Sequence, residues 1–516
     1  MANAGNKNLL GRKIRVPVRL RKLGLVLLAL IAALAIWLLT RDPVLTTPAL
    51  PALASAELRK ESEALTSYDV RASFQADRRT LTARQRITYT NTTGQALEYI
   101  YLRTYANAFA SPDSSPAATS ELYDLCYKKG FSAGGLTLIS VTIDNTNAKW
   151  SYEDEAGTAL KLEAPRLRPG ATIVISITYT ITLPECAYRF GMSSGIAALN
   201  NALPTVAMWD NGEWRLEPYY PIGDPFISEC ANWRVELTLP EGWRAAASGA
   251  RIHDDSSTSG PVVFEALAVR DFSLVLSNRY ILSQINVNGV TVTAFALSSG
   301  EARALARDAA SALKLFGELF GPYPWPSYDV AIADIPFGGM ESSGLSMIAL
   351  SSAADASSRS LSVAHETAHQ WFHAIAGNDE LREPWLDEAP CVYAVTLYIQ
   401  RTKGEFAFNQ YVETEIEPSM RLTIPRGVTI GSAVELFASW KEYQTIVYQR
   451  GGSMLLGLRD AMGAEKLNEA LRLYIKNARL RIGSRAMFMD ALSQVSGSDW
   501  SGYMEDYLDT YILGGW

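Results

Sequence analysis

Short runs of alternating apolar and polar residues fill the first half of the chain. Thr172–Thr182 and Trp233–Leu239 are rich in β-branched residues and alternate along much of their length. Turn-forming residues, as at 91–94, separate runs of this kind. Short strands divided by Gly, Pro, Asn and Asp are typical of antiparallel sheets. The pattern therefore predicts a mostly antiparallel β domain over residues 65–280.

From about residue 281 the apolar spacing becomes that of helices. Glu301–Phe320 carries Ala and Leu at helical spacing and stops at a proline-rich turn. Asp329–Ala333 has the pattern of a short buried strand, and further helices are predicted over 359–375 and from Trp385. A second domain is thus expected over 281–516, and the predicted fold class is multidomain α+β.

The N-terminal segment has a pattern of its own. Residues 1–22 are basic without an acid, and an unbroken apolar run follows at Leu23–Leu39. A basic flank before an apolar run of this length predicts a transmembrane signal anchor over 23–40, with a cytoplasmic N-terminus and an extracytoplasmic remainder. A cleaved signal peptide is the alternative. Residues 41–64 contain three prolines and predict a linker.

Composition supports a globular protein of several domains. Of 516 residues, 48% are hydrophobic, which is ample for large cores. Beyond the seven basic residues of 1–22, 40 Lys and Arg stand against 54 Asp and Glu, so no basic face for nucleic acid is expected. The four cysteines form no C-x-x-C pair. Two alternatives remain open: one disulfide among Cys126, Cys186 and Cys230, or unpaired buried thiols.

The strongest chemical signal is H-E-x-x-H at His365, Glu366 and His369. On a helix, side chains at i and i+4 lie on one face, where two imidazoles can bind one zinc ion. The intervening glutamate can then act as general base. Glu388 lies near the start of the second predicted helix, which begins at Trp385, and two helices joined by a short turn can lie antiparallel. A His₂Glu site with one open position is therefore predicted.

Other residues have two interpretations each. His373 is also i+4 from His369, and we interpret it as a pocket-edge or packing residue. Glu341 lies in a glycine-rich stretch and is either a ligand-binding or a solvated carboxylate. Tyr448 is either an oxyanion partner or a core tyrosine. The loop 214–225, dense in aromatics and prolines, either contributes to a pocket or packs on the β domain.

Together these motifs resemble the M1, or gluzincin, zinc aminopeptidases. H-E-x-x-H followed after eighteen residues by Glu388 is the family's ligand pattern. Four further segments are similar to family motifs: Phe337–Ser342 to G-[GA]-M-E-N, Trp385–Glu388 to WLNE, Tyr448–Gly451 to Y-E-K-G, and Tyr219–Pro225 to F-P-x-x-D-E-P. The resemblance covers about 65–516 and implies a saddle-shaped β domain followed by a thermolysin-like catalytic domain.

The resemblance also implies roles for individual residues. One zinc ion is held by His365, His369 and Glu388, with Glu366 as general base and Tyr448 as oxyanion partner. The substrate loop consists of Gly338, Gly339, Met340 and Glu341, whose carboxylate binds the free α-amine. The implied enzyme is an aminopeptidase acting on peptides with a free N-terminus. For a further amine-binding carboxylate in the β domain, Glu213 and Glu217 are candidates.

The chain departs from the family pattern at several positions, and these departures leave parts of the functional prediction open. Ser342 replaces asparagine, and Ala389–Cys391 replaces G-F-A after the third ligand, with Pro390 expected to be tolerated in the first helical turn. The chain ends soon after Tyr448, so we expect no large C-terminal helical domain and a more open site. A peptide-binding scaffold, an endopeptidase and an epoxide hydrolase are the alternatives. Side-chain preference and oligomeric state are not predicted.

Overall fold

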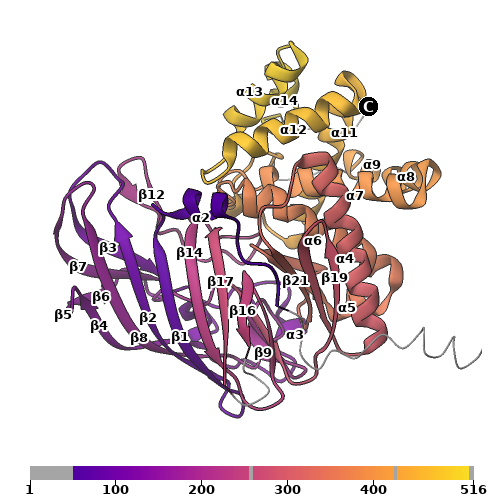
Figure 1. Ribbon diagram of the computed structural model, residues 1–516. Coiled ribbons are helices and arrows are strands. Elements are labelled where there is room, and N and C mark those ends of the chain that lie inside the picture. Colours follow the sequence, from indigo (N-terminus) through magenta and orange to yellow (C-terminus); the bar gives the residue numbers. More distant parts are fainter. Residues whose placement is uncertain (1–49, 255–259, 423–426, 511–516) are drawn as a thin grey trace, which may run out of the picture. The chain divides into compact units, whose positions relative to one another are not determined.

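The structure is a computed structural model that describes residues 50–254, 260–422 and 427–510 (Figure 1). These residues belong to one compact unit, Thr46–Trp516. The predicted basic segment 1–22 and membrane span 23–40 lie outside the described residues. Within the described part, no helix is both long enough and apolar enough to cross a bilayer.

The alternating runs of the first half form an eight-stranded sheet. Its neighbouring strands are antiparallel, except that β1 and β14 are parallel. One face is buried and the other is largely exposed, as the alternation along β2 and β8 predicts. In spatial order the strands are β16 (Ala250–Asp254), β17 (Pro261–Val269), β14 (Ala231–Thr238), β1 (Ser67–Gln75), β2 (Thr80–Thr90), β8 (Thr172–Thr182), β4 (Gly135–Ile143) and β5 (Thr146–Asn147).

Three smaller sheets complete the β-rich part. One has the order β15 (Arg244–Ala247), β18 (Leu274–Ser277), β10 (Ile196–Leu199) and β9 (Phe190–Ser193). Another has the order β11 (Thr205–Val206), β3 (Leu97–Arg103), β7 (Ala159–Leu167) and β6 (Trp150–Tyr152). The third is the hairpin of β12 (Trp209–Asp210) and β13 (Glu213–Trp214). The prediction of a β-rich first half is confirmed.

A mixed five-stranded sheet begins at Ile281. In spatial order its strands are β19 (Ile281–Val287), β20 (Val290–Ala296), β21 (Ser327–Ala333), β23 (Leu345–Ala349) and β22 (Gly339–Ser342). The three central strands are parallel, and the two outer pairs are antiparallel. The long helix α4 (Ser299–Phe320) connects β20 to β21, as parallel neighbours require.

Both faces of this sheet are covered. Helices α4 and α6 (Ala356–His369) pack on one face, while β10 and β15 of a four-stranded sheet contact the other. Successive residues of β21 divide between the two faces, because side chains alternate along a strand. Tyr328 contacts Thr367 of α6, whereas Ala331 belongs to the apolar cluster shared with the four-stranded sheet. Burial on both sides explains why the strand ends in the apolar run Val330–Ala333.

The remaining elements are helical. Helix α6 continues without a break into the π-helical segment η3 (Gln370–Ile375), so the predicted helix 359–375 begins three residues earlier than expected. Helix α7 (Trp385–Lys403) begins at the predicted residue. The helices that follow are α8 (Glu405–Tyr411), α9 (Glu417–Met420), α10 (Trp440–Tyr443), α11 (Gly451–Met462), α12 (Ala464–Ala478), α13 (Arg485–Ser496) and α14 (Ser501–Leu508). Two further π-helical segments, η4 (Val412–Ile416) and η6 (Gln444–Arg450), precede α9 and α11.

The predicted linker needs a correction. Its last part forms helix α2 (Ala56–Ser62), which Ser55 caps by accepting a hydrogen bond from the Leu58 amide. Leu58 is buried, and Arg59 forms an ion pair with Glu265 of β17. Three prolines upstream made the whole stretch resemble a spacer, but one buried leucine is enough to dock this turn on the sheet.

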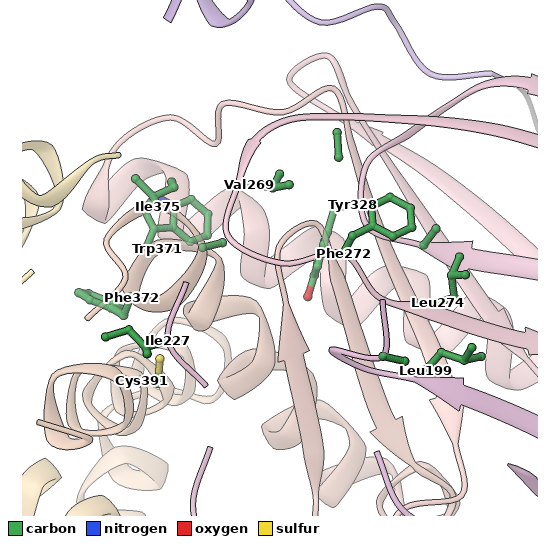
Figure 2. Close-up of a cluster of buried hydrophobic side chains, with 14 of the residues drawn as sticks. Leu199, Ile227, Val269, Phe272, Leu274, Tyr328, Trp371, Phe372, Ile375 and Cys391 are labelled. Carbon is green, nitrogen blue, oxygen red and sulfur yellow. The ribbon is translucent and has the colours of Figure 1, made fainter. Parts of the chain in front are cut away.

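One large apolar core joins the β-rich and helical parts. Figure 2 shows Leu199 and Phe272 from the β-rich part in the same cluster as Trp371 and Phe372 of η3. The H-E-x-x-H segment is therefore held from behind by buried aromatic side chains, whose packing fixes the helix that carries it.

Candidate metal and substrate site

The two histidines of the motif meet the predicted glutamate at one point. His365 Nε2 lies 3.1 Å from His369 Nε2 and 3.2 Å from Glu388 Oε2, and the third separation, His369 to Glu388, is 3.5 Å. Helices α6 and α7 pack against each other, so side chains twenty residues apart converge. Burial alone would raise the pKa of the Glu388 carboxyl, but His369 and His365 hold that pKa below its usual range.

These three atoms fit a zinc ion. Zinc binds imidazole nitrogen and carboxylate oxygen at about 2.0–2.2 Å, so donors sharing a tetrahedral ion lie about 3.3–3.5 Å apart. The observed separations of 3.1, 3.2 and 3.5 Å are close to that spacing, so only a small outward shift of His365 would be needed. His369 also places its other nitrogen, Nδ1, 2.6 Å from Asp387 Oδ1. A carboxylate at that position orients a ligating imidazole.

Glu366 faces the same cavity, next to the ligand trio. Its carboxylate is buried, and its Oε2 has no hydrogen-bond partner among the described residues. Burial raises the pKa of Glu366 well above its usual range, which suits a group that accepts and returns a proton. Gly339 lies against it, because a Cβ at 339 would come within 2.3 Å of Glu366 Oε1. A side chain at 339 would therefore displace the Glu366 carboxylate from this position.

Glu341 enters the cavity from a strand rather than from a loop. The sequence predicted a glycine-rich connector, but Gly339–Ser342 form β22 and pair with β23. Alternation along β22 sends Met340 into the apolar cluster behind the sheet and Glu341 toward the cavity. Glu341 is 4% exposed, and its Oε1 has no hydrogen-bond partner in the described part of the chain. Burial, and then the nearby charge of Asp224, raises its pKa.

Tyr448 completes the wall opposite Glu366. It lies in the π-helical segment η6, and such segments are frequent at functional sites. Its hydroxyl donates a short hydrogen bond to Glu388 Oε1, and its ring stacks on His365 with centroids 5.7 Å apart. Neither interpretation of Tyr448 from the sequence placed it in contact with the third ligand.

The site residues line one cavity of about 550 Å³. The predicted substrate residues Gly338, Gly339, Met340 and Glu341 are part of its wall, together with the ligand trio, Glu366 and Tyr448. Two buried charged residues of the wall, Arg189 and Asp224, were not among the predicted site residues, and they form an ion pair with each other. Asp224 lies in the loop 214–225, for which a pocket role was one of two interpretations. No local pattern marked Arg189.

The two amine-site candidates in the β-rich part lie outside the cavity. Glu213 is exposed on the β12–β13 hairpin, and Glu217 is paired with Arg215. Neither lines the cavity, and Asp224 is the carboxylate that the β-rich part supplies there.

The departures from the family pattern have simple structural consequences. Ser342 points away from the cavity, where it donates to Ser273 and accepts from Asn200. Pro390 lies inside α7 rather than in its first turn, so the carbonyl four residues before it loses its helical donor. The helix nevertheless continues to Lys403. All four cysteines are unpaired and buried, which matches the second of the two possibilities.

Comparison with known proteins agrees with this geometry. Residues 306–507 match the peptidase family M1 domain. Aminopeptidase M1-B of Oryza sativa subsp. japonica is 32% identical over 185 residues, which cover 33% of this chain and 21% of that protein. Endoplasmic reticulum aminopeptidase 1 of Homo sapiens is 26% identical over 262 residues, covering 48% and 27% respectively. The chain thus spans about a quarter of the length of these curated relatives.

Solved structures share the fold over nearly the whole chain. A mutant M1 zinc metallopeptidase from Deinococcus radiodurans superposes with a TM-score of 0.61 at 17% identity, covering 91% of this chain and 97% of that one. The same mutant bound to a Tyr-Ser-Ala substrate gives a TM-score of 0.61 at 18% identity. The motif, the converging ligands and the matched family model agree: residues 306–507 are similar to the peptidase family M1 domain.

Proposed function

We propose that this protein is a zinc-dependent aminopeptidase that removes N-terminal residues from peptides. The observation that carries the proposal is the buried, unpartnered Oε1 of Glu341 beside the ligand trio. An uncompensated buried carboxylate is unfavourable, so its oxygen marks the place of a cationic ligand. A free α-ammonium group is such a ligand, and an internal peptide bond offers none. The aminopeptidase names of the curated relatives support the same activity.

The metal would be held by His365, His369 and Glu388. When bound there, zinc supplies Lewis-acid polarisation of the substrate carbonyl and of water. Glu366 accepts a proton from the attacking water and passes it to the leaving amine. Tyr448 donates a hydrogen bond to the oxygen that gains negative charge, in exchange for its hydrogen bond to Glu388. Glu341 binds the α-amine and thereby sets the distance from the N-terminus to the bond that breaks.

The test is a panel of fluorogenic aminoacyl amides and their N-acetylated counterparts, assayed with and without a chelator. We expect cleavage of the free-amine substrates, loss of cleavage with the chelator, and recovery on adding Zn²⁺. Cleavage of N-acetylated substrates at equal rates would favour an endopeptidase. A purified protein without bound zinc or hydrolytic activity would favour the peptide-binding scaffold.

We also propose that residues 23–40 anchor the protein in a membrane, with the N-terminus in the cytoplasm and the catalytic part outside it. The support comes from the sequence alone, in which a basic segment precedes the apolar run Leu23–Leu39. Carbonate extraction and protease protection of the full chain test this. Recovery of a soluble protein that begins after residue 40 would show cleavage instead.

A further inference from the structure

Behind the ligand trio lies a second group of buried ionisable side chains. His373, on η3, is surrounded by three carboxylates from separate parts of the chain. Its Nδ1 lies 2.7 Å from Glu380 Oε1 and 3.8 Å from Asp387 Oδ2, while its Nε2 lies 3.7 Å from Asp271 Oδ1. All four side chains are at least nine-tenths buried, and His373 does not line the cavity.

Asp387 connects this group to the metal site. Its Oδ1 lies 2.6 Å from Nδ1 of His369, and its Oδ2 is the atom that faces His373. His369 uses its other nitrogen, Nε2, toward the ligand trio. A carboxylate on the non-ligating nitrogen of a zinc-bound histidine fixes the ring and its tautomer. Any contact that holds Asp387 in place therefore acts on the metal site.

A cationic His373 offsets part of the negative charge of the three carboxylates around it. Three buried carboxylates surround it, and an uncompensated buried charge costs several kcal/mol. Burial alone would lower the pKa of His373, but Glu380, Asp271 and Asp387 together raise that pKa well above its usual range. Asp271 is fixed by the Ser343 amide, which donates to its Oδ1 at 2.7 Å. Glu380 and Asp271 thus lie at the two ring nitrogens of His373, and Nδ1, which is nearest to Glu380, also faces Asp387.

We propose that His373 is a positioning residue for the metal site, which fixes the carboxylate of Asp387 against Nδ1 of the ligand His369. This proposal rests on the proposed function, in that zinc occupies the trio of His365, His369 and Glu388. His373 touches neither substrate nor metal, and it acts through Asp387. It therefore differs from the pocket-edge or packing role that the sequence indicated.

The test measures zinc affinity, which does not depend on turnover. The dissociation constant of Zn²⁺ is measured by competition with a chromophoric chelator on the full chain, for the parent, His373→Gln, Asp387→Ala and the double variant. Because lost outer partners of a ligating histidine weaken metal binding by about 10- to 100-fold, we expect a loss in that range for Asp387→Ala and about 10-fold for His373→Gln. The double variant should bind no more weakly than Asp387→Ala.

A spectroscopic measurement separates positioning from general damage. The visible absorption of Co²⁺ in the site reports ligand geometry, and we expect His373→Gln to shift it in the same direction as Asp387→Ala. His253→Gln is the matched control, because His253 is an exposed histidine of β16 and should change neither affinity nor spectrum. Thermal unfolding with excess chelator shows whether each metal-free variant is folded. If His373→Gln does not fold, Glu380→Gln removes the nearest partner of His373 and should weaken zinc binding likewise.

Two results would overturn the proposal. One is a folded His373→Gln variant with zinc affinity within about 3-fold of the parent, well short of the loss expected for a displaced outer partner. The other is a double variant whose loss is the product of the two single losses, since independent effects multiply. A parent chain that binds no zinc would instead remove the proposed function, and with it this inference.

Discussion

The two faces of the five-stranded sheet each carry a buried carboxylate, and the two carboxylates have opposite surroundings. Asp329, on β21, lies on the face toward the four-stranded sheet, and its Oδ2 accepts a hydrogen bond from the Ala247 amide of β15 at 3.2 Å. Glu341, on β22, lies on the helical face and opens into the cavity beside Glu366. They are 6% and 4% exposed, so burial does not distinguish them.

The difference lies in what faces each carboxylate. Burial raises the pKa of both groups, to about 7 for Asp329. Asp329 accepts a hydrogen bond from a backbone amide and thereby connects the five-stranded sheet to the four-stranded sheet. The free oxygen of Glu341 belongs to the wall of the cavity, beside the ligand trio. A raised pKa therefore does not identify a functional carboxylate, whereas a missing partner beside a cavity does.

The largest effect is expected on the helical face, from Glu366→Gln. Gln keeps the shape of the side chain but accepts no proton, so turnover of an aminoacyl amide should fall by about 10³-fold. The zinc content should not change, because Glu366 is not a ligand. Steady-state kinetics together with atomic absorption on the same sample measure both. Parent-like turnover in this variant would show that another group is the base.

Glu341→Gln should come next. A hydrogen bond to a charged group contributes roughly 1.5–3 kcal/mol, so kcat/KM for free-amine substrates should fall by about 10- to 100-fold. Selectivity over the N-acetylated substrates should shrink by the same factor, which kinetics on matched pairs would measure. Unfolding should not become easier, since the variant loses an unpaired buried charge. An unchanged preference for free amines would place the amine site elsewhere, with Asp224 as the next residue to test.

On the opposite face, substitution should reduce stability and leave chemistry intact. Met347 of β23 is fully buried in the apolar cluster behind the sheet. Met347→Ala should lower the free energy of unfolding by roughly 2–5 kcal/mol through lost burial and a cavity. Denaturant titration measures this, and kcat at a temperature where the variant is folded should stay near the parent value. A large loss of kcat in a fully folded variant would contradict this division between the faces.

The smallest effect is expected from Asp329→Asn, and it should depend on pH. The pKa of Asp329 is raised to about 7 in the folded chain, so the folded state binds more protons than the unfolded state between about pH 4 and 7. The parent therefore loses stability as pH rises through that window, and the variant lacks this contribution. The melting temperature of Asp329→Asn relative to the parent should be higher at pH 8 than at pH 5. A difference independent of pH would show that Asp329 does not titrate there.

Local sequence patterns predicted the main strands and helices of the molecule well. Period-two alternation identified the β-rich half, and helical spacing identified α4, α6 and the start of α7, because these periods follow from backbone geometry alone. H-E-x-x-H needed no tertiary information either, since i and i+4 lie together on any helix. The edge strand β22 was missed because its glycines and its carboxylate are typical of a loop.

The sequence by itself thus determined the chemistry that the chain carries: two histidines and a glutamate on one helical face, with Glu388 at the start of the next helix. Only the tertiary structure decided which side chains surround these residues. Asp387 was visible beside Glu388, but its role depends on His373, and the role of His373 depends on Asp271, about a hundred residues away along the chain. Contacts of that kind leave no periodic trace in the sequence, because they are set by how separate elements pack around a shared core.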